Sequence, residues 1–164
     1  MNTLTSKPWW NYLQNDIKDL LGESFLLLEK SKTWRKKFHD YSFVVFPASK
    51  AYEGFLKKLL LDTGLISEKD YYGKHFRIGK SLNPSLDVKY RDESWVYDSL
   101  ADFCKSEELP KKLWKTWKTA RNLVFHWFPN EVNAITLPEA EDRVRLVIES
   151  IDLVYTECGV KLNK

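Results

Sequence analysis

The chain has 164 residues, of which 43% are hydrophobic, 15% aromatic and 30% charged, with only six glycines and six prolines. This composition excludes disordered, collagen-like and low-complexity proteins, and it predicts one globular domain, 1–164, with a well-packed core. The 26 basic and 23 acidic residues give a net charge of +3. Bulk charge alone therefore does not indicate a nucleic-acid-binding protein.

The two cysteines, Cys104 and Cys158, lie far apart in the chain, without a C-x-x-C motif or a neighbouring histidine. This spacing argues against a zinc site and against a disulfide scaffold, so we expect reduced cysteines in a cytoplasmic protein. No apolar run approaches the roughly 20 residues of a membrane-spanning helix, and residues 1–16 lack the apolar core of a secretion signal. We expect no membrane association, no metal and no cofactor.

Apolar residues that recur every three or four positions predict a first helix from Pro8 to about Glu29. A second helix is predicted from about Ser42 to Thr63, with Pro47 in its first turns or at a kink. Its opening residues 41–46 are β-branched and aromatic, so a short strand is the alternative for that stretch.

Residues 65–91 lose this period and predict a long connection, with one helical turn after Ser67, where S-E-K-D has the spacing of a capping box. Three more helices are predicted at about 92–106, at 110–129 and from the N-cap residue Thr136 onward. The fold class is therefore all-α: an antiparallel bundle of four or five helices with a long connection between helices two and three.

The predicted fourth helix has two distinct faces when its residues are placed 100° apart on a wheel. One face carries its apolar side chains, which are Leu113, Trp114, Trp117, Ala120, Val124, Phe125 and Phe128. The other carries Lys111, Lys115, Lys118, Asn122 and His126 in one line. A row of cations suits a polyanion such as RNA, whereas a solvated face is the ordinary explanation for lysines on an amphipathic helix.

Arg121 lies between Trp117 and Phe125, beside the apolar face of this helix. An unpaired guanidinium is costly to bury, so Arg121 needs a charge partner or a phosphate, unless its head extends to the solvent at the edge of the face. Histidine can accept and donate protons near neutral pH. Cleavage of an RNA phosphodiester needs such a group and a cation for the developing charge, and His126 and Arg121 supply them.

The stretch Arg121-Asn-Leu-Val-Phe-His126 resembles the R-N-x-x-x-H form of the HEPN ribonuclease signature. The resemblance covers roughly residues 40–158. It implies a helical bundle that forms a homodimer with a composite cleft, in which His126 is the acid–base residue, Arg121 holds the scissile phosphate and Asn122 orients one of them. HEPN ribonucleases cut RNA without a metal, leaving a 2′,3′-cyclic phosphate and a 5′-hydroxyl. Many are toxins of toxin–antitoxin or anti-phage systems, which implies a cognate antitoxin.

The stretch Lys50-Ala-Tyr-Glu53-Gly54 resembles a second feature, seen in the ribonuclease LS-type toxins. There a helix before the motif presents a basic residue and, three positions on, a glutamate that serve the same site; here the basic residue is lysine instead of arginine. The resemblance implies that Lys50 and Glu53 belong to the site, and Glu53 is placed to be the charge partner of Arg121. Alternatively, Glu53 forms an ordinary i,i+4 pair with Lys57, worth about 0.3 kcal/mol.

His39 and His75 lie among basic residues, where they either contact RNA or belong to solvated loops. The sequence predicts a metal-independent endoribonuclease of HEPN type, with Arg121, His126, Asn122, Glu53 and Lys50 as catalytic residues. Lys111, Lys115 and Lys118 are expected to bind RNA. The alternatives are a catalytically silent HEPN-like module that binds a nucleotide or a protein, and an interaction domain in which the motif is coincidental.

Overall fold

The computed structural model describes residues 2–131 and 133–158, and this part of the chain is helical and contains no strand. The prediction of an all-α fold is confirmed. The longer helices are α2 (Asn15–Thr33), α3 (Ser42–Asp62), α6 (Tyr97–Cys104), α7 (Glu108–Trp117) and α8 (Leu137–Glu157). The shorter elements are α1 (Asn2–Thr5), η1 (Trp10–Tyr12), α4 (Glu68–Tyr72), α5 (Ile78–Ser81), η2 (Val88–Tyr90), the π-helical turn η3 (Lys118–Asn122) and η4 (Pro129–Glu131).

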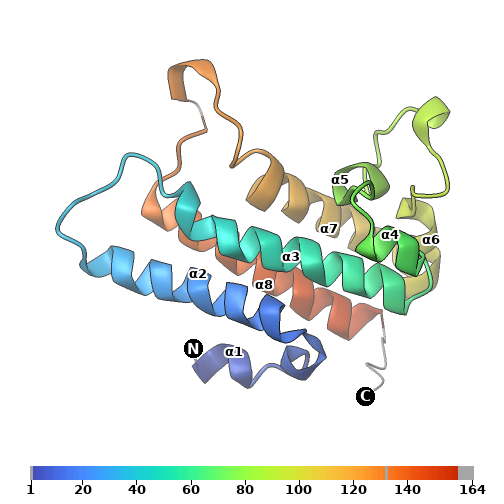
Figure 1. Cartoon of the computed structure of the whole chain (residues 1–164), viewed down its shortest axis with the longest axis horizontal. Helices are drawn as coiled ribbons and strands as arrows, with labels where there is room; N and C mark the ends of the chain where they lie inside the picture. Colours follow the sequence, from blue (N-terminus) through green and yellow to red (C-terminus); the bar gives the residue numbers. More distant parts are fainter. Residues whose placement is uncertain (1, 132, 159–164) are drawn as a thin grey trace.

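Helix α3 forms the centre of the bundle. Figure 1 shows α2 and α3 side by side and antiparallel, with α7 running antiparallel to α8, and α3 contacts α2, α7 and α8. Its buried side chains are Val44, Val45, Pro47, Ala48, Ser49, Ala51, Tyr52, Phe55, Leu56, Leu59 and Leu60. A helix with so many buried positions belongs to the core of the protein rather than to its surface.

The second and fifth predicted helices are confirmed closely. Helix α3 covers Ser42–Asp62, so the alternative of a strand at 41–46 is wrong, and Pro47 lies in the second turn of the helix. Helix α8 begins after Thr136, whose hydroxyl accepts from the backbone N–H of Glu139 while the Glu139 carboxylate accepts from the backbone N–H of Thr136. This capping box satisfies two N–H groups that have no partner within the helix.

The first predicted helix begins seven residues too early. Helix α2 begins at Asn15, because the preceding segment folds back against α8. Trp9 is buried and donates from Nε1 to Oδ1 of Asp152 at 2.5 Å, and the Lys7 ammonium lies 2.7 Å from Oδ2 of the same carboxylate. A contact across the whole length of the chain thus determines where the helix starts.

The long connection between α3 and α6 contains more structure than predicted. The capping box of Ser67 and Asp70 opens α4, as expected, and α5 and η2 follow. Trp95 donates from Nε1 to the carbonyl of Asn83, and the Arg91 guanidinium lies 4.1 Å from the centre of the Trp95 ring. These contacts hold the end of the connection, and α6 begins at Tyr97 instead of 92.

Cys104 at the end of α6 and Cys158 just after α8 form a disulfide bond. The expectation of two reduced cysteines is therefore wrong: the packing of the bundle brings the two helix ends together, and the Ser106 hydroxyl also donates to the Glu157 carboxylate there. Because disulfides are rare in the cytosol, the cysteines no longer support a cytoplasmic location. Within the described residues, no helix is both long and apolar enough to cross a membrane.

Candidate functional site

The helix that carries the motif ends earlier than predicted. Regular α-helix stops at Trp117 and continues as the π-helical turn η3, in which the backbone N–H of Leu123 donates to the carbonyl of Lys118 at 3.0 Å. Residues 123–128 are not helical. The bulky residues of this stretch have modest helix propensity, and Pro129 disfavours a helical conformation at residue 128.

Ser49 on α3 holds the π turn in place. Its hydroxyl lies 2.5 Å from the carbonyl oxygen of Ala120, and both residues are buried. A buried carbonyl without a partner is costly, so this contact compensates for the loss of regular helical hydrogen bonding. Single π-helical turns occur frequently at functional sites, and this turn carries Arg121 and Asn122.

The prediction that His126 continues the helical line of Lys118 and Asn122 is wrong, because the helix has already ended. The side chain nevertheless lies beside Asn122: Nε2 of His126 is 3.3 Å from Oδ1 of Asn122. An amide oxygen only accepts hydrogen bonds, so this contact requires a proton on Nε2. In the neutral imidazole the lone pair is then on Nδ1, which can accept a proton.

Arg121 faces both a carboxylate and an aromatic ring. Its Nε lies 3.6 Å from Oε2 of Glu53, and its guanidinium carbon lies 5.3 Å from the centre of the Trp117 ring. The charge partner that the wheel predicts for Arg121 is therefore present. The Arg121 side chain remains 41% exposed, so its head is accessible to a ligand.

A cavity of about 470 Å³ brings the predicted residues of the two helices together. Its lining comes from α3 and from the segment that includes η3: Phe46, Ser49, Lys50, Glu53, Arg121, Phe125 and His126. The Lys50 ammonium lies 5.8 Å from the centre of the Phe46 ring at this cavity. Four of the five predicted catalytic side chains thus line one cavity, and the fifth, Asn122, contacts His126.

The three lysines predicted to bind RNA lie outside this cavity. Lys111 is exposed and pairs with Glu108 at 3.1 Å. Lys115 lines a different cavity, about 440 Å³ in volume, between α7 and α8, where acidic and basic side chains alternate. Lys118 is exposed at the start of the π turn. Their role in RNA binding stays a prediction. It requires that a bound RNA extend beyond the Arg121 cavity along α7.

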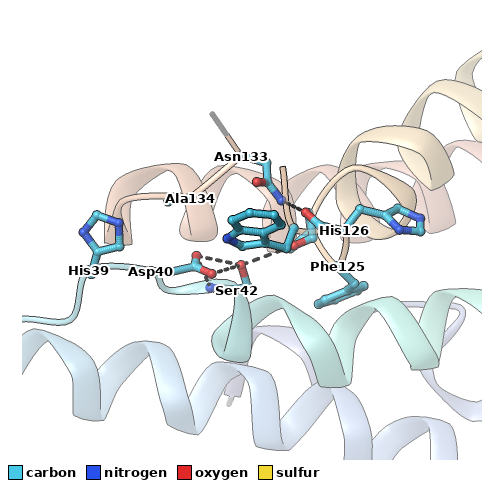
Figure 2. Close-up of a pocket in the computed structure, with 9 residues that line it drawn as sticks. His39, Asp40, Ser42, Phe125, His126, Asn133 and Ala134 are labelled. Carbon is cyan, nitrogen blue, oxygen red and sulfur yellow. Dashed lines mark hydrogen bonds between the residues drawn. The ribbon is translucent and has the colours of Figure 1, made fainter. Parts of the chain in front are cut away.

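A second hollow, about 330 Å³ in volume, adjoins the first and shares Phe125 and His126 with it. Its lining consists of His39, Asp40, Ser42, Val124, Phe125, His126, Trp127, Asn133 and Ala134. Figure 2 shows His39 and His126 at opposite ends of this hollow, with Asp40 and Ser42 between them. His126 therefore separates two concave surfaces, and a ligand that crosses it would contact both.

Asp40 organises the second hollow. Its carboxylate accepts from the hydroxyl of Ser42 at 2.6 Å, from the backbone N–H of Ser42 at 3.0 Å and from the backbone N–H of Ile135 at 3.1 Å. Burial alone would raise the pKa of Asp40, but these hydrogen bonds and the charge of His39 lower it overall. The carboxylate therefore stays ionised and joins the segment before α3 to the segment before α8.

Sequence reasoning missed Asp40, Asn133 and Ser49. Asn133 donates its side-chain amide to the backbone carbonyl of His126, which holds the motif loop. For Asp40 the sequence offered a local signal, because an aspartate two residues before the first residue of a helix commonly accepts a hydrogen bond from a backbone N–H there. The other two act only through contacts that the folded chain creates, so no local pattern could have shown them.

Comparison of this chain with family models, with curated proteins and with solved structures found no match. We therefore infer a function from the geometry of the two hollows and from the residues that line them. Within residues 2–131 and 133–158, no three His, Cys, Asp or Glu side chains form a group that could hold a metal ion.

Proposed function

We propose that this chain is a metal-independent endoribonuclease of HEPN type. The observation that supports the proposal most strongly is the cavity that Lys50, Glu53, Arg121 and His126 line together. A cation for a phosphate and a group that transfers protons are the two requirements of RNA cleavage by the 2′-hydroxyl. These four residues come from two separate sequence stretches, and a coincidental motif would not require them to meet.

In the proposed reaction, Nδ1 of His126 removes the proton from the 2′-hydroxyl. The 2′-oxygen then bonds to phosphorus, the bond from phosphorus to the 5′-oxygen breaks, and the leaving oxygen takes up a proton. The products are a 2′,3′-cyclic phosphate and a 5′-hydroxyl. Arg121 binds the phosphate oxygens, Glu53 orients Arg121, and Asn122 fixes the imidazole with Nε2 protonated.

The reaction needs a proton acceptor on one side of the phosphate and a donor on the other, and each chain brings one imidazole to the Arg121 cavity. A homodimer that places two copies of the cavity face to face would supply both. Two large apolar side chains that line the cavity are exposed to solvent, Phe46 at 50% and Phe125 at 37%, with ring centres 5.3 Å apart. Leu123 and Phe128, which lie close to Phe125 in the chain, are 41% and 42% exposed. Clustered exposed apolar side chains are typical of a protein–protein interface.

The proposal extends to a role as the toxin of a toxin–antitoxin or anti-phage defence system, with a cognate antitoxin as partner. If the chain is such a toxin, expression of the wild-type chain should stop cell growth. The Arg121→Ala variant at the same expression level should be harmless. Equal growth with both chains would contradict the role as a toxin and leave the enzymatic proposal to be tested separately.

The alternative is a catalytically silent HEPN-like module that binds a nucleotide or a protein. One observation favours it: the Glu53 carboxylate lies close enough to offset the positive charge that Arg121 would offer a phosphate. A folded protein that binds but does not cleave RNA would support this alternative.

The experiment compares cleavage of a mixed RNA substrate in EDTA by wild type, Arg121→Ala and His126→Ala. The matched control is Arg145→Ala, since this side chain is exposed and lies outside the Arg121 cavity. We expect each site variant to lose activity by about 100-fold or more, as is usual for acid–base and electrostatic groups. Equal activity of a site variant and its control would contradict the assignment.

A further inference from the structure

The second hollow contains an aromatic side chain that the proposed catalysis does not use. Trp127 lines the hollow and is 77% exposed, although tryptophan is a costly residue to leave in water. It directly follows His126 in the chain. A flat exposed ring beside the reacting group offers a surface on which any nucleobase can stack.

The loop before α3 carries positive charge and leads directly into the lining of this hollow. Arg35, Lys36 and Lys37 are exposed, and none of them forms an ion pair with another residue that the structure describes. They lie just before His39 and Asp40, which line the hollow. Three exposed cations on the segment that leads into the lining of the hollow complement the phosphates of a nucleic acid.

The loop is anchored rather than loosely attached. The ring of Phe38 in this loop packs edge to face against Trp34, Tyr41 and Phe43. The backbone N–H of Phe38 donates to the Tyr41 hydroxyl. Tyr41 in turn donates from its backbone N–H to the carbonyl of Ile135. The basic residues are therefore held at the same end of the bundle as the motif loop.

The ionised carboxylate of Asp40 lies within the hollow and would repel a phosphate there. A nucleobase carries no negative charge, and its N–H groups can donate hydrogen bonds to a carboxylate. With about 330 Å³, the hollow falls in the size range of small-molecule pockets, roughly 300–1,000 Å³. Charge and size thus place a base inside the hollow and its phosphates outside it.

From this arrangement we infer that the hollow between His39 and His126 is a nucleoside subsite for single-stranded RNA. The base stacks on Trp127, and the adjoining phosphates contact Arg35, Lys36 and Lys37. The inference rests on the proposed function for one detail only, namely that the bound nucleotide adjoins the phosphate held by Arg121. Because His126 lines both hollows, the two nucleotides joined by the scissile bond would lie on opposite sides of His126.

The test measures binding apart from cleavage. A fluorescent 2′-O-methyl RNA of 12 nucleotides cannot be cleaved through its 2′-oxygens, so its anisotropy reports affinity for the intact wild-type chain. We expect Trp127→Ala to weaken binding on the order of 10-fold and Trp127→Phe to retain most of it. Tyr72→Ala is the matched control, because Tyr72 is 78% exposed on α4 and does not line the hollow; it should leave affinity unchanged.

The combined change of Arg35, Lys36 and Lys37 to alanine should weaken binding and reduce its dependence on salt concentration. An affinity of Trp127→Ala within twofold of wild type would overturn the subsite, even if the wild-type protein cleaves ordinary RNA. Conversely, loss of binding in Trp127→Ala from a wild type that cleaves no RNA would support the subsite and reject the ribonuclease. Melting curves of each variant establish that the fold is intact.

Discussion

Glu53 on α3 and Arg121 on the π turn form an ion pair with 3.6 Å between Oε2 and Nε, at the edge of the proposed cleft. The pair joins the two sequence stretches, 50–54 and 121–126, that resemble ribonuclease motifs. Both side chains are partly exposed, so the pair adds at most about 1 kcal/mol to stability. Its main physical effect is to fix the direction in which the guanidinium points.

Replacement of Glu53 should therefore affect catalysis more than stability. We expect Glu53→Gln to lower the rate of single-turnover RNA cleavage about 10-fold, while the free energy of unfolding in urea changes by less than about 1 kcal/mol. The control is Glu149→Gln on α8, because Glu149 and Arg145 form a pair at a similar distance, 3.7 Å, that is more exposed and lies outside the Arg121 cavity. Equal cleavage rates for the two variants would show that Glu53 does not position Arg121.

Ser49→Ala tests whether the π turn positions Arg121. The change leaves the buried carbonyl of Ala120 without its partner, which should cost about 1–3 kcal/mol of unfolding free energy and lower cleavage as well. Ser24→Ala is the matched control, because Ser24 is also buried and donates to a backbone carbonyl, that of Val44. It should lose similar stability but keep its cleavage rate below the unfolding temperature. Loss of activity in both would indicate a general effect of destabilisation.

The capping box of α8 predicts a dependence of stability on pH. Backbone and side-chain hydrogen bonds from Thr136 lower the pKa of Glu139 in the folded state. A carboxylate with a lowered pKa stabilises the fold above its ordinary pKa, and this contribution is lost as pH falls through the lowered value. Urea unfolding of Glu139→Gln should thus differ from wild type at pH 7 and converge with it in acid. A difference that stays constant from pH 7 to pH 2 would contradict this.

Removal of the Thr136 hydroxyl tests the same cap at fixed pH. We expect Thr136→Ala to reduce the free energy of unfolding by about 1 kcal/mol at pH 7. Ser67→Ala removes the equivalent hydroxyl from the short helix α4 and should cost less, because α4 buries no side chain. Urea unfolding curves of both variants measure the difference, and a larger loss in Ser67→Ala would be unexpected.

The disulfide between Cys104 and Cys158 closes a long loop, with a sequence separation of 54. Such a bond stabilises chiefly by restricting the unfolded chain, by about 2–4 kcal/mol. The variant with both cysteines changed to serine should lose this amount, and a reducing agent should destabilise wild type but not the variant. Identical urea midpoints for wild type with and without reductant would show that the bond does not form in solution.

The sequence was most informative where local signals decide the structure. Helices α3 and α8 agree with their predictions because an apolar period and a cap, such as Thr136 with Glu139, act within a few residues. The meeting of Glu53 with Arg121 could also be predicted, because each lies next to the apolar face of its own helix.

The sequence-based predictions were wrong where contacts between residues far apart in the chain determine the structure. The helical wheel assumes a constant 100° per residue, but Ser49, far away in the chain, stabilises a π turn that ends the helix before His126. Likewise, the hydrogen bond from Trp9 to Asp152 on α8 holds the N-terminal segment against α8, so α2 begins only at Asn15. The second hollow depends on Asp40 meeting Ile135, which no periodic pattern reveals.

The most direct test of the central claim is the chemistry of the cut ends. Purified wild-type protein is incubated in EDTA with an RNA oligonucleotide, and with the same oligonucleotide carrying 2′-deoxyribose at the position before each cut. We expect 2′,3′-cyclic phosphate and 5′-hydroxyl ends from the first substrate and no cut at the substituted positions of the second. Cleavage at the 2′-deoxy positions, or 5′-phosphate ends, would contradict attack by the 2′-oxygen and with it the proposed roles of Arg121 and His126.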